Sequence, residues 1–133
     1  AKTRNIGQVD HLGVLDARGL FGAGKLVRIA TVAVGKAPDG AALADGGKLL
    51  YVTNQHEDSV SVIDADTLKV VRTLRGFGYP EGIASHRDRV YVVNWMDDNL
   101  SVLDAVSGQT IKTIATGQNS RGFGAFIGDA PAP

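Results

Sequence analysis

The sequence contains no cysteine among its 133 residues. This absence excludes disulfide frameworks, thiolate metal sites and thiol nucleophiles together, and it leaves the redox compartment undetermined. Neither sign of charge is in excess, because fourteen basic and fourteen acidic side chains give a formal net charge of zero. A chain without net charge has no global field to hold a nucleic-acid backbone or an anionic membrane, so nucleic acid is not an expected partner.

Long apolar runs are missing as well. No apolar stretch approaches the roughly 20 residues that a membrane-spanning helix needs, so we predict no membrane span. The chain has no nucleophile elbow, P-loop, zinc signature or dinucleotide fingerprint, and its 17 glycines fall at turns. We therefore predict no catalytic residue and no cofactor. The first residue, Ala1, is what a processed export signal leaves, and also what proteolytic trimming leaves. On the first interpretation the protein is exported, periplasmic or secreted.

A repeat of 40 residues is the strongest pattern in the chain. Tyr-Val-Thr-Asn at 51–54 returns as Tyr-Val-Val-Asn at 91–94. The same spacing relates Tyr51 to Tyr91, Asn54 to Asn94, Asp64 to Asp104 and Thr73 to Thr113. This spacing is the length of one four-stranded propeller blade.

Each copy shows the internal pattern of an antiparallel meander. It opens on a tripeptide that ends in glycine, and a short innermost strand and a turn such as Asp45-Gly46-Gly47 follow. Small polar and apolar residues then alternate with a period of two, as in Val-Ser-Val-Ile at 60–63, which favours strands over helices. The opening tripeptides are Pro38-Asp39-Gly40, Pro80-Glu81-Gly82 and Ser120-Arg121-Gly122. The sequence thus predicts an all-β fold of about three β-propeller blades.

A weaker third copy precedes these two, since residues 11–17 match residues 59–65. A glycine-rich loop at 18–25 is longer than its counterparts, and we expect it to protrude. The predicted organisation is a partial blade with a long hairpin loop at 1–34, blades at 35–75 and 76–115, a ring-closing strand at 116–128 and a tail at 129–133.

These motifs resemble the YVTN family of β-propeller repeats, whose namesake tetrapeptide stands at 51–54 and, less closely, at 91–94. The resemblance extends from residue 7 to residue 128. It implies that the chain corresponds to the C-terminal blades of a larger propeller, and that residues 121–127 supply the strand that closes the ring. About three blades are fewer than the four to eight of a closed propeller. The missing blades are expected from a longer chain, a second chain or self-association.

One face of the predicted propeller collects polar and aromatic residues. In propellers generally, this face and the central channel carry ligands, and the loops between second and third strands lie there with the loops that lead into the next blade. We predict that a ligand or partner, small molecule or protein, binds at residues of these loops, namely Asn54, His56, Tyr79, Glu81, Asn94, Trp95 and Arg121.

These residues admit more than one role. Trp95 and Tyr79 can stack on a ring or a sugar or anchor a partner, or else pack between blades. Arg121 can hold an anion, or it can pair with Glu81. His56 and Asp58 are the candidates for metal ligands, but neighbouring side chains rarely converge on one ion, so no metal site is predicted.

The leading hypothesis is a non-catalytic binding or interaction module. The first alternative is a part or accessory of a periplasmic quinone- or haem-linked redox enzyme, which the resemblance to YVTN propellers implies only through the fold. The second alternative is the binding of single-stranded nucleic acid, against which the neutral charge and the single tryptophan argue.

Overall fold

The computed structural model describes residues 10–16, 24 and 26–132. This part of the chain contains ten β-strands and two short 3₁₀ turns, and it has no α-helix. None of its helical turns is long and apolar enough to cross a membrane. The strands are β1 (His11–Asp16), β2 (Val27–Ala33), β3 (Pro38–Ala44), β4 (Leu49–Asn54), β5 (Ser59–Asp64), β6 (Lys69–Arg75), β7 (Pro80–His86), β8 (Arg89–Asn94), β9 (Asn99–Asp104) and β10 (Thr110–Ala115), and the turns are η1 (Asp45–Gly47) and η2 (Gln55–Glu57).

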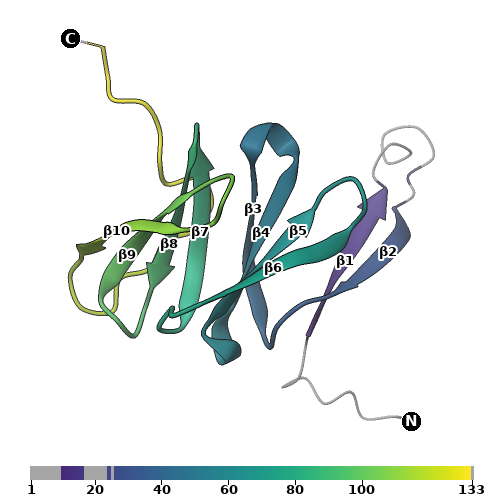
Figure 1. Cartoon of the computed structure of the whole chain (residues 1–133), viewed down its shortest axis with the longest axis horizontal. Coiled ribbons are helices and arrows are strands. Elements are labelled where there is room, and N and C mark those ends of the chain that lie inside the picture. Colours follow the sequence, from purple (N-terminus) through teal and green to yellow (C-terminus); the bar gives the residue numbers. More distant parts are fainter. Residues whose placement is uncertain (1–9, 17–23, 25, 133) are drawn as a thin grey trace.

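The strands form two four-stranded antiparallel meanders and one hairpin. Strands β3 to β6 make the first sheet, β7 to β10 the second, and β1 and β2 the hairpin. The three units follow one another in a row, with the hairpin beside the first sheet (Figure 1). The register repeats too, because Tyr51 lies opposite Val62 and Tyr91 lies opposite Val102. The predicted all-β fold of propeller blades is confirmed.

Local irregularities recur at equivalent positions of the units. Each third strand shifts register against its fourth strand, at Val14/Leu15 in the hairpin and at Val62/Ile63 in the first sheet. Such bulges increase local twist, as the splayed strands of a blade require. The predicted turn at 45–47 forms as η1, in which Gly46 and Gly47 have φ of 63° and 86°.

Two apolar clusters hold the row together. The larger one lies between the two four-stranded sheets, and the smaller one lies between the hairpin and the outer side of the first sheet. Tyr51 is fully buried in the larger cluster, and its hydroxyl donates to the Ala105 carbonyl of the second sheet at 2.9 Å. Burial of this side chain raises the pKa of Tyr51 above its ordinary value. The sheets therefore pack face to face as neighbouring blades.

A hydroxyl group also joins the two blades near their innermost strands. Thr53 donates to the Glu81 carbonyl at 2.8 Å and accepts from the Gly40 amide at 2.9 Å. A Cβ added at Gly40 would lie 2.7 Å from the same Glu81 carbonyl. The glycine of the opening tripeptide is thus required by the close approach of the next blade.

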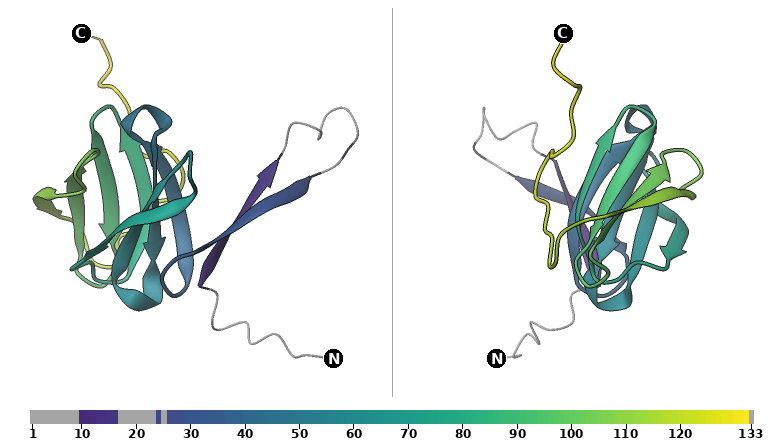
Figure 2. Two further views of the ribbon diagram at one scale, coloured as in Figure 1. Left: turned by 45° about the vertical axis from the view of Figure 1, so that its right-hand side comes forward. Right: turned by 90° about the vertical axis from the view of Figure 1, so that its left-hand side faces the viewer.

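The C-terminal segment differs from its prediction. Residues 116–132 form no strand, although a ring-closing strand was expected at 116–128. The segment still runs beside β7 (Figure 2). The two are so close that a Cβ at Gly82 would overlap the Gly122 carbonyl. It has no second strand of its own blade to pair with in the described part of the chain, and an unpaired backbone does not make a ladder.

Further along, the tail is held on the side of the molecule opposite the predicted site. Asp129 lies 2.9 Å from His86 and 2.7 Å from Arg87. Most of the predicted protruding loop, residues 18–25, lies outside the described residues.

Candidate functional site

Two kinds of loop meet on one face of the blades. Asp58, at the end of the η2 loop, accepts a hydrogen bond from the Tyr79 amide at 3.0 Å. Asp98 accepts one from the Asn119 amide at 2.7 Å in the same way. Both aspartates have left-handed backbone conformations, with φ of 52° and 50°. The loop between the second and third strands is therefore tied to the loop that enters the next blade.

Four side chains of these loops form a continuous row, which we call the aromatic row: His56, Tyr79, Trp95 and Arg121. The His56 ring lies 5.7 Å from the Tyr79 ring, and its Nε2 is 3.4 Å from the Tyr79 hydroxyl. The Tyr79 and Trp95 rings are 5.2 Å apart at 60°. The Arg121 guanidinium lies 5.3 Å from the Trp95 ring centre. These distances are those of edge-to-face and cation–π contacts.

Glu81 anchors the end of the row. Its side chain is 8% exposed, and its Oε1 is 3.5 Å from the Arg121 Nη1. Its Oε2 is buried and accepts no hydrogen bond within the described residues. Arg121 is half-exposed, so it neutralises the buried carboxylate while keeping donor groups toward solvent.

Asn54 and Asn94 lie beneath this face and not on it. Both are buried, at 0% and 1% exposure. Asn54 donates to Ser59 and Ser61 at 3.1 and 3.0 Å, and Asn94 repeats this pattern with Ser101 at 2.7 Å. These asparagines brace the second strand against the third, so they support the loops above them.

The two candidate metal ligands do not converge. Within the described residues no group of three or more histidines and carboxylates could hold a metal ion. The His56 ring faces the Tyr79 ring, and the Asp58 carboxylate accepts a hydrogen bond from the Tyr79 amide. Both side chains thus contact Tyr79 of the aromatic row.

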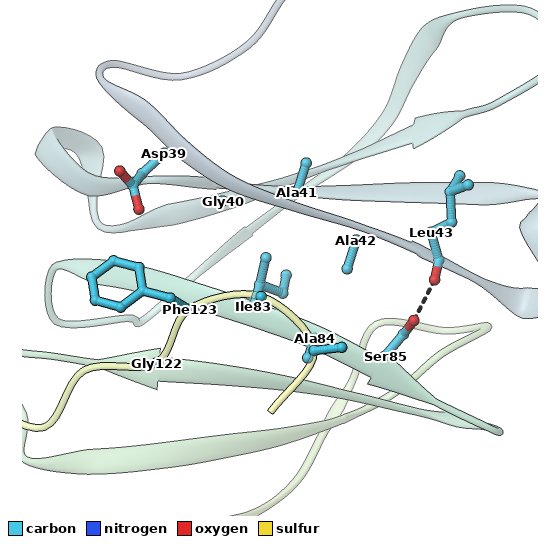
Figure 3. A pocket seen from close by; sticks show the side chains of 12 residues that line it. Asp39, Gly40, Ala41, Ala42, Leu43, Ile83, Ala84, Ser85, Gly122 and Phe123 are labelled. Atoms are coloured by element: carbon cyan, nitrogen blue, oxygen red, sulfur yellow. Dashed lines mark hydrogen bonds between the residues drawn. The ribbon is translucent and has the colours of Figure 1, made fainter. Parts of the chain in front are cut away.

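A concavity lies between the innermost strands. A groove of about 470 Å³ runs between β3, β7 and residues 122–125 (Figure 3). The Ser85 hydroxyl donates to the Leu43 carbonyl across it, and Phe123 is 69% exposed beside it. Sequence reasoning did not find this groove, because its lining is mostly glycine and alanine. Its sequence signal is a pair of small residues shortly after each opening tripeptide, namely Ala41-Ala42, Ala84-Ser85 and Gly124-Ala125.

No family model matches the chain, and the search of curated proteins found no match. Solved structures do resemble it. Kuenenia stuttgartiensis hydrazine synthase is 24% identical with a TM-score of 0.74, over 86% of this chain and 32% of that one. The dihydro-haem d1 dehydrogenase NirN, solved in complex with DHE, is 26% identical with a TM-score of 0.65, over 86% and 25%. AztD from Citrobacter koseri is 16% identical with a TM-score of 0.65, over 83% and 30%.

These structures contain β-propellers. The chain spans at most about a third of the length of each of the three. It thus has the fold of a propeller segment and not of a closed ring.

Proposed function

We propose that this chain is a non-catalytic β-propeller binding module of the YVTN type, which holds a ligand or partner on its aromatic row. One observation carries the proposal: His56, Tyr79, Trp95 and Arg121 come from four separate loops and form one connected row. Tryptophan, tyrosine and arginine are the residues that most often dominate binding energy at interfaces. The blades beneath act as a rigid scaffold.

The row is held in place before any ligand arrives. Asp58 fixes the Tyr79 backbone, and the Trp95 amide donates to the Tyr79 carbonyl at 3.3 Å. Glu81 positions Arg121 at the end of the row. A Cβ at position 78 would overlap the Asp97 carboxylate, so a side chain there would have to displace Asp97. Side chains that are ordered in the free protein lose less conformational entropy on binding, which favours affinity.

The single tryptophan reports on this site directly. We would titrate the protein with terephthalate and with cellobiose, an aromatic dicarboxylate and a neutral disaccharide, and follow Trp95 fluorescence. We expect one of them to change the emission, and Tyr79→Ala to weaken that binding by about 10-fold or more. His86→Ala, on the opposite side, is the control and should bind as the native chain does. Binding that survives Tyr79→Ala, or an emission that neither probe changes, would contradict the proposal.

A second candidate function is a part or accessory of a haem- or quinone-linked redox enzyme. The similarity to the dihydro-haem d1 dehydrogenase NirN favours it, at 26% identity over 86% of this chain. Both proposals include an exported, periplasmic or secreted, location. Haemin added to the purified protein tests this candidate, since a bound haem shifts the visible absorption band and an unchanged spectrum argues against it.

A further inference from the structure

The chain contains two Asp-Gly dipeptides, and the structure places them in opposite surroundings. They are Asp39-Gly40, in the innermost strand β3, and Asp45-Gly46, in the turn η1 that follows the same strand. An aspartate that precedes glycine is open to attack on its own side chain, because glycine has no Cβ to shield its backbone nitrogen. Both dipeptides share this chemistry, so the fold decides which of them reacts.

The reaction at such a dipeptide needs no outside reagent except water. The backbone nitrogen of the glycine forms a bond to the carbon of the aspartate side-chain carboxyl group, and the amide hydrogen leaves with the carboxyl hydroxyl as one molecule of water. The product is a five-membered succinimide ring. Water then opens this ring at either carbonyl, which restores aspartate or gives isoaspartate, whose main chain runs through the former side chain. The backbone must rotate for the nitrogen to reach the carboxyl carbon.

The fold holds Asp39-Gly40 against this reaction. The Gly40 amide donates to the Thr53 hydroxyl at 2.9 Å, so the attacking nitrogen is already engaged. The same glycine lies between two blades, since a Cβ there would come within 2.7 Å of the Glu81 carbonyl. Isoaspartate adds one carbon atom to the main chain, and β3 has no space for it at this point. Asp39 is exposed, so burial of its carboxyl group is not what protects it.

The turn at Asp45-Gly46 has none of these restraints. Asp45 takes φ of 51°, in the left-handed region that residues with a side chain rarely adopt, and Gly46 follows with φ of 63°. A Cβ added at Gly46 or Gly47 would meet nothing within 4 Å, so the space beside both glycines is open. The ladder between β3 and β4 ends at Ala44 and Leu49, before the turn. An extra main-chain carbon at position 45 therefore lengthens a loop and interrupts no strand.

We propose that Asp45 is a site of spontaneous isoaspartate formation in the folded protein, whereas Asp39 is protected. Three differences carry the proposal: the engaged amide of Gly40, its close approach to the next blade, and the open, left-handed turn at Gly46. The modification is independent of the aromatic row, because η1 and η2 lie at opposite ends of β4. It acts instead beside the contact between the blades, since the residues that flank the turn in the ladder belong to the larger apolar cluster.

A single peptide reports on both positions. Trypsin cleaves after Lys36 and Lys48 and releases residues 37–48, which contain both dipeptides. We would incubate the full chain at neutral pH, digest it, and fragment this peptide by electron transfer, which distinguishes isoaspartate from aspartate at each position. We expect several times more isoaspartate at position 45 than at position 39. The free peptide 37–48, incubated under the same conditions, is the control, and it should isomerise at both positions to comparable extents.

Two variants separate the causes. Thr53→Val removes the hydroxyl that engages the Gly40 amide and keeps the shape of the side chain, so it should raise isoaspartate at position 39 and leave position 45 unchanged. Asp45→Glu should abolish the modification at position 45, because the ring would need six members. Circular dichroism confirms that each variant is folded.

The comparison of the folded chain with the free peptide does not depend on any variant. Equal amounts of isoaspartate at the two positions of the folded chain, or more at position 39, would overturn the inference. The same holds if position 45 stays aspartate while the free peptide isomerises, or if the free peptide shows the same preference as the folded chain. An unchanged position 39 in folded Thr53→Val would refute the protective role of that hydroxyl.

Discussion

Tyr51 and Tyr91 occupy the same position in two blades with the same strand register, yet their environments differ. Tyr51 is fully buried against the next blade, whereas Tyr91 is only half-buried. The loop face differs as well, because Met96 stands at the position equivalent to His56 and Trp95 at the position equivalent to Gln55. The comparison teaches that the repeat sets the strand framework, while position in the row decides which equivalent residues are buried and which are free to bind.

Replacement of the two tyrosines tests this comparison most strongly. Tyr51→Ala should lower the free energy of unfolding by about 3–5 kcal/mol, because it opens a cavity between the sheets. Tyr91→Ala should cost about 1 kcal/mol or less. Urea denaturation followed by circular dichroism measures both. Equal losses would show that the two blades do not differ in the way described.

The glycines of the close approach give a smaller effect. Gly82→Ala should cost about 1–3 kcal/mol, since its Cβ would overlap the Gly122 carbonyl and displace the C-terminal segment from β7. Gly117→Ala is the control, because a Cβ there meets nothing within 4 Å, and it should stay within about 0.5 kcal/mol of the native chain. If Gly82→Ala behaves like Gly117→Ala in urea denaturation, the segment does not lie against the second blade.

The smallest expected effect concerns pH, and here the two blades should agree. Hydrogen bonds from the backbone of Thr67 hold the pKa of Asp64 below its ordinary 3.8, and the backbone of Ser107 does the same for Asp104. A lowered folded-state pKa contributes stability above the unfolded value, and this contribution is lost as the pH falls through the folded pKa.

Unfolding midpoints measured from about pH 5 to about pH 2 should therefore fall less steeply in Asp64→Asn and in Asp104→Asn, by similar amounts. Asn keeps the acceptor oxygen of the turn, so the variants separate charge from geometry. A marked difference between the two would break the equivalence of the blades at this turn.

Much of the fold can be predicted from the residue pattern. The spacing between Tyr51 and Tyr91 and the alternation at 60–63 predict the meanders, because period-two patterning and blade length are local properties of the chain. Loop equivalence also predicts that Tyr79, Trp95 and Arg121 lie on one face. It could not separate exposed from buried members of that face, and so it grouped Asn54 and Asn94 with them.

The expected ring-closing strand shows what the residue pattern does not predict. The tripeptide Ser120-Arg121-Gly122 predicts where the segment runs, and the Gly122 contact with Gly82 agrees with it. A strand, however, needs a hydrogen-bonding neighbour, and that neighbour belongs to a blade that the described residues do not complete. The residue pattern of one segment does not show whether a neighbouring strand is present to pair with it.

The sequence by itself determined the period, the strand order and the turns, because these depend on residues that are close along the chain. Only the tertiary structure decided that Glu81 is buried beneath Arg121, that Trp95 contacts Tyr79, and that Tyr91 is half-buried while its equivalent Tyr51 is fully buried. Burial and ring contacts depend on how neighbouring blades pack, and packing is a property of the whole row and not of any one repeat.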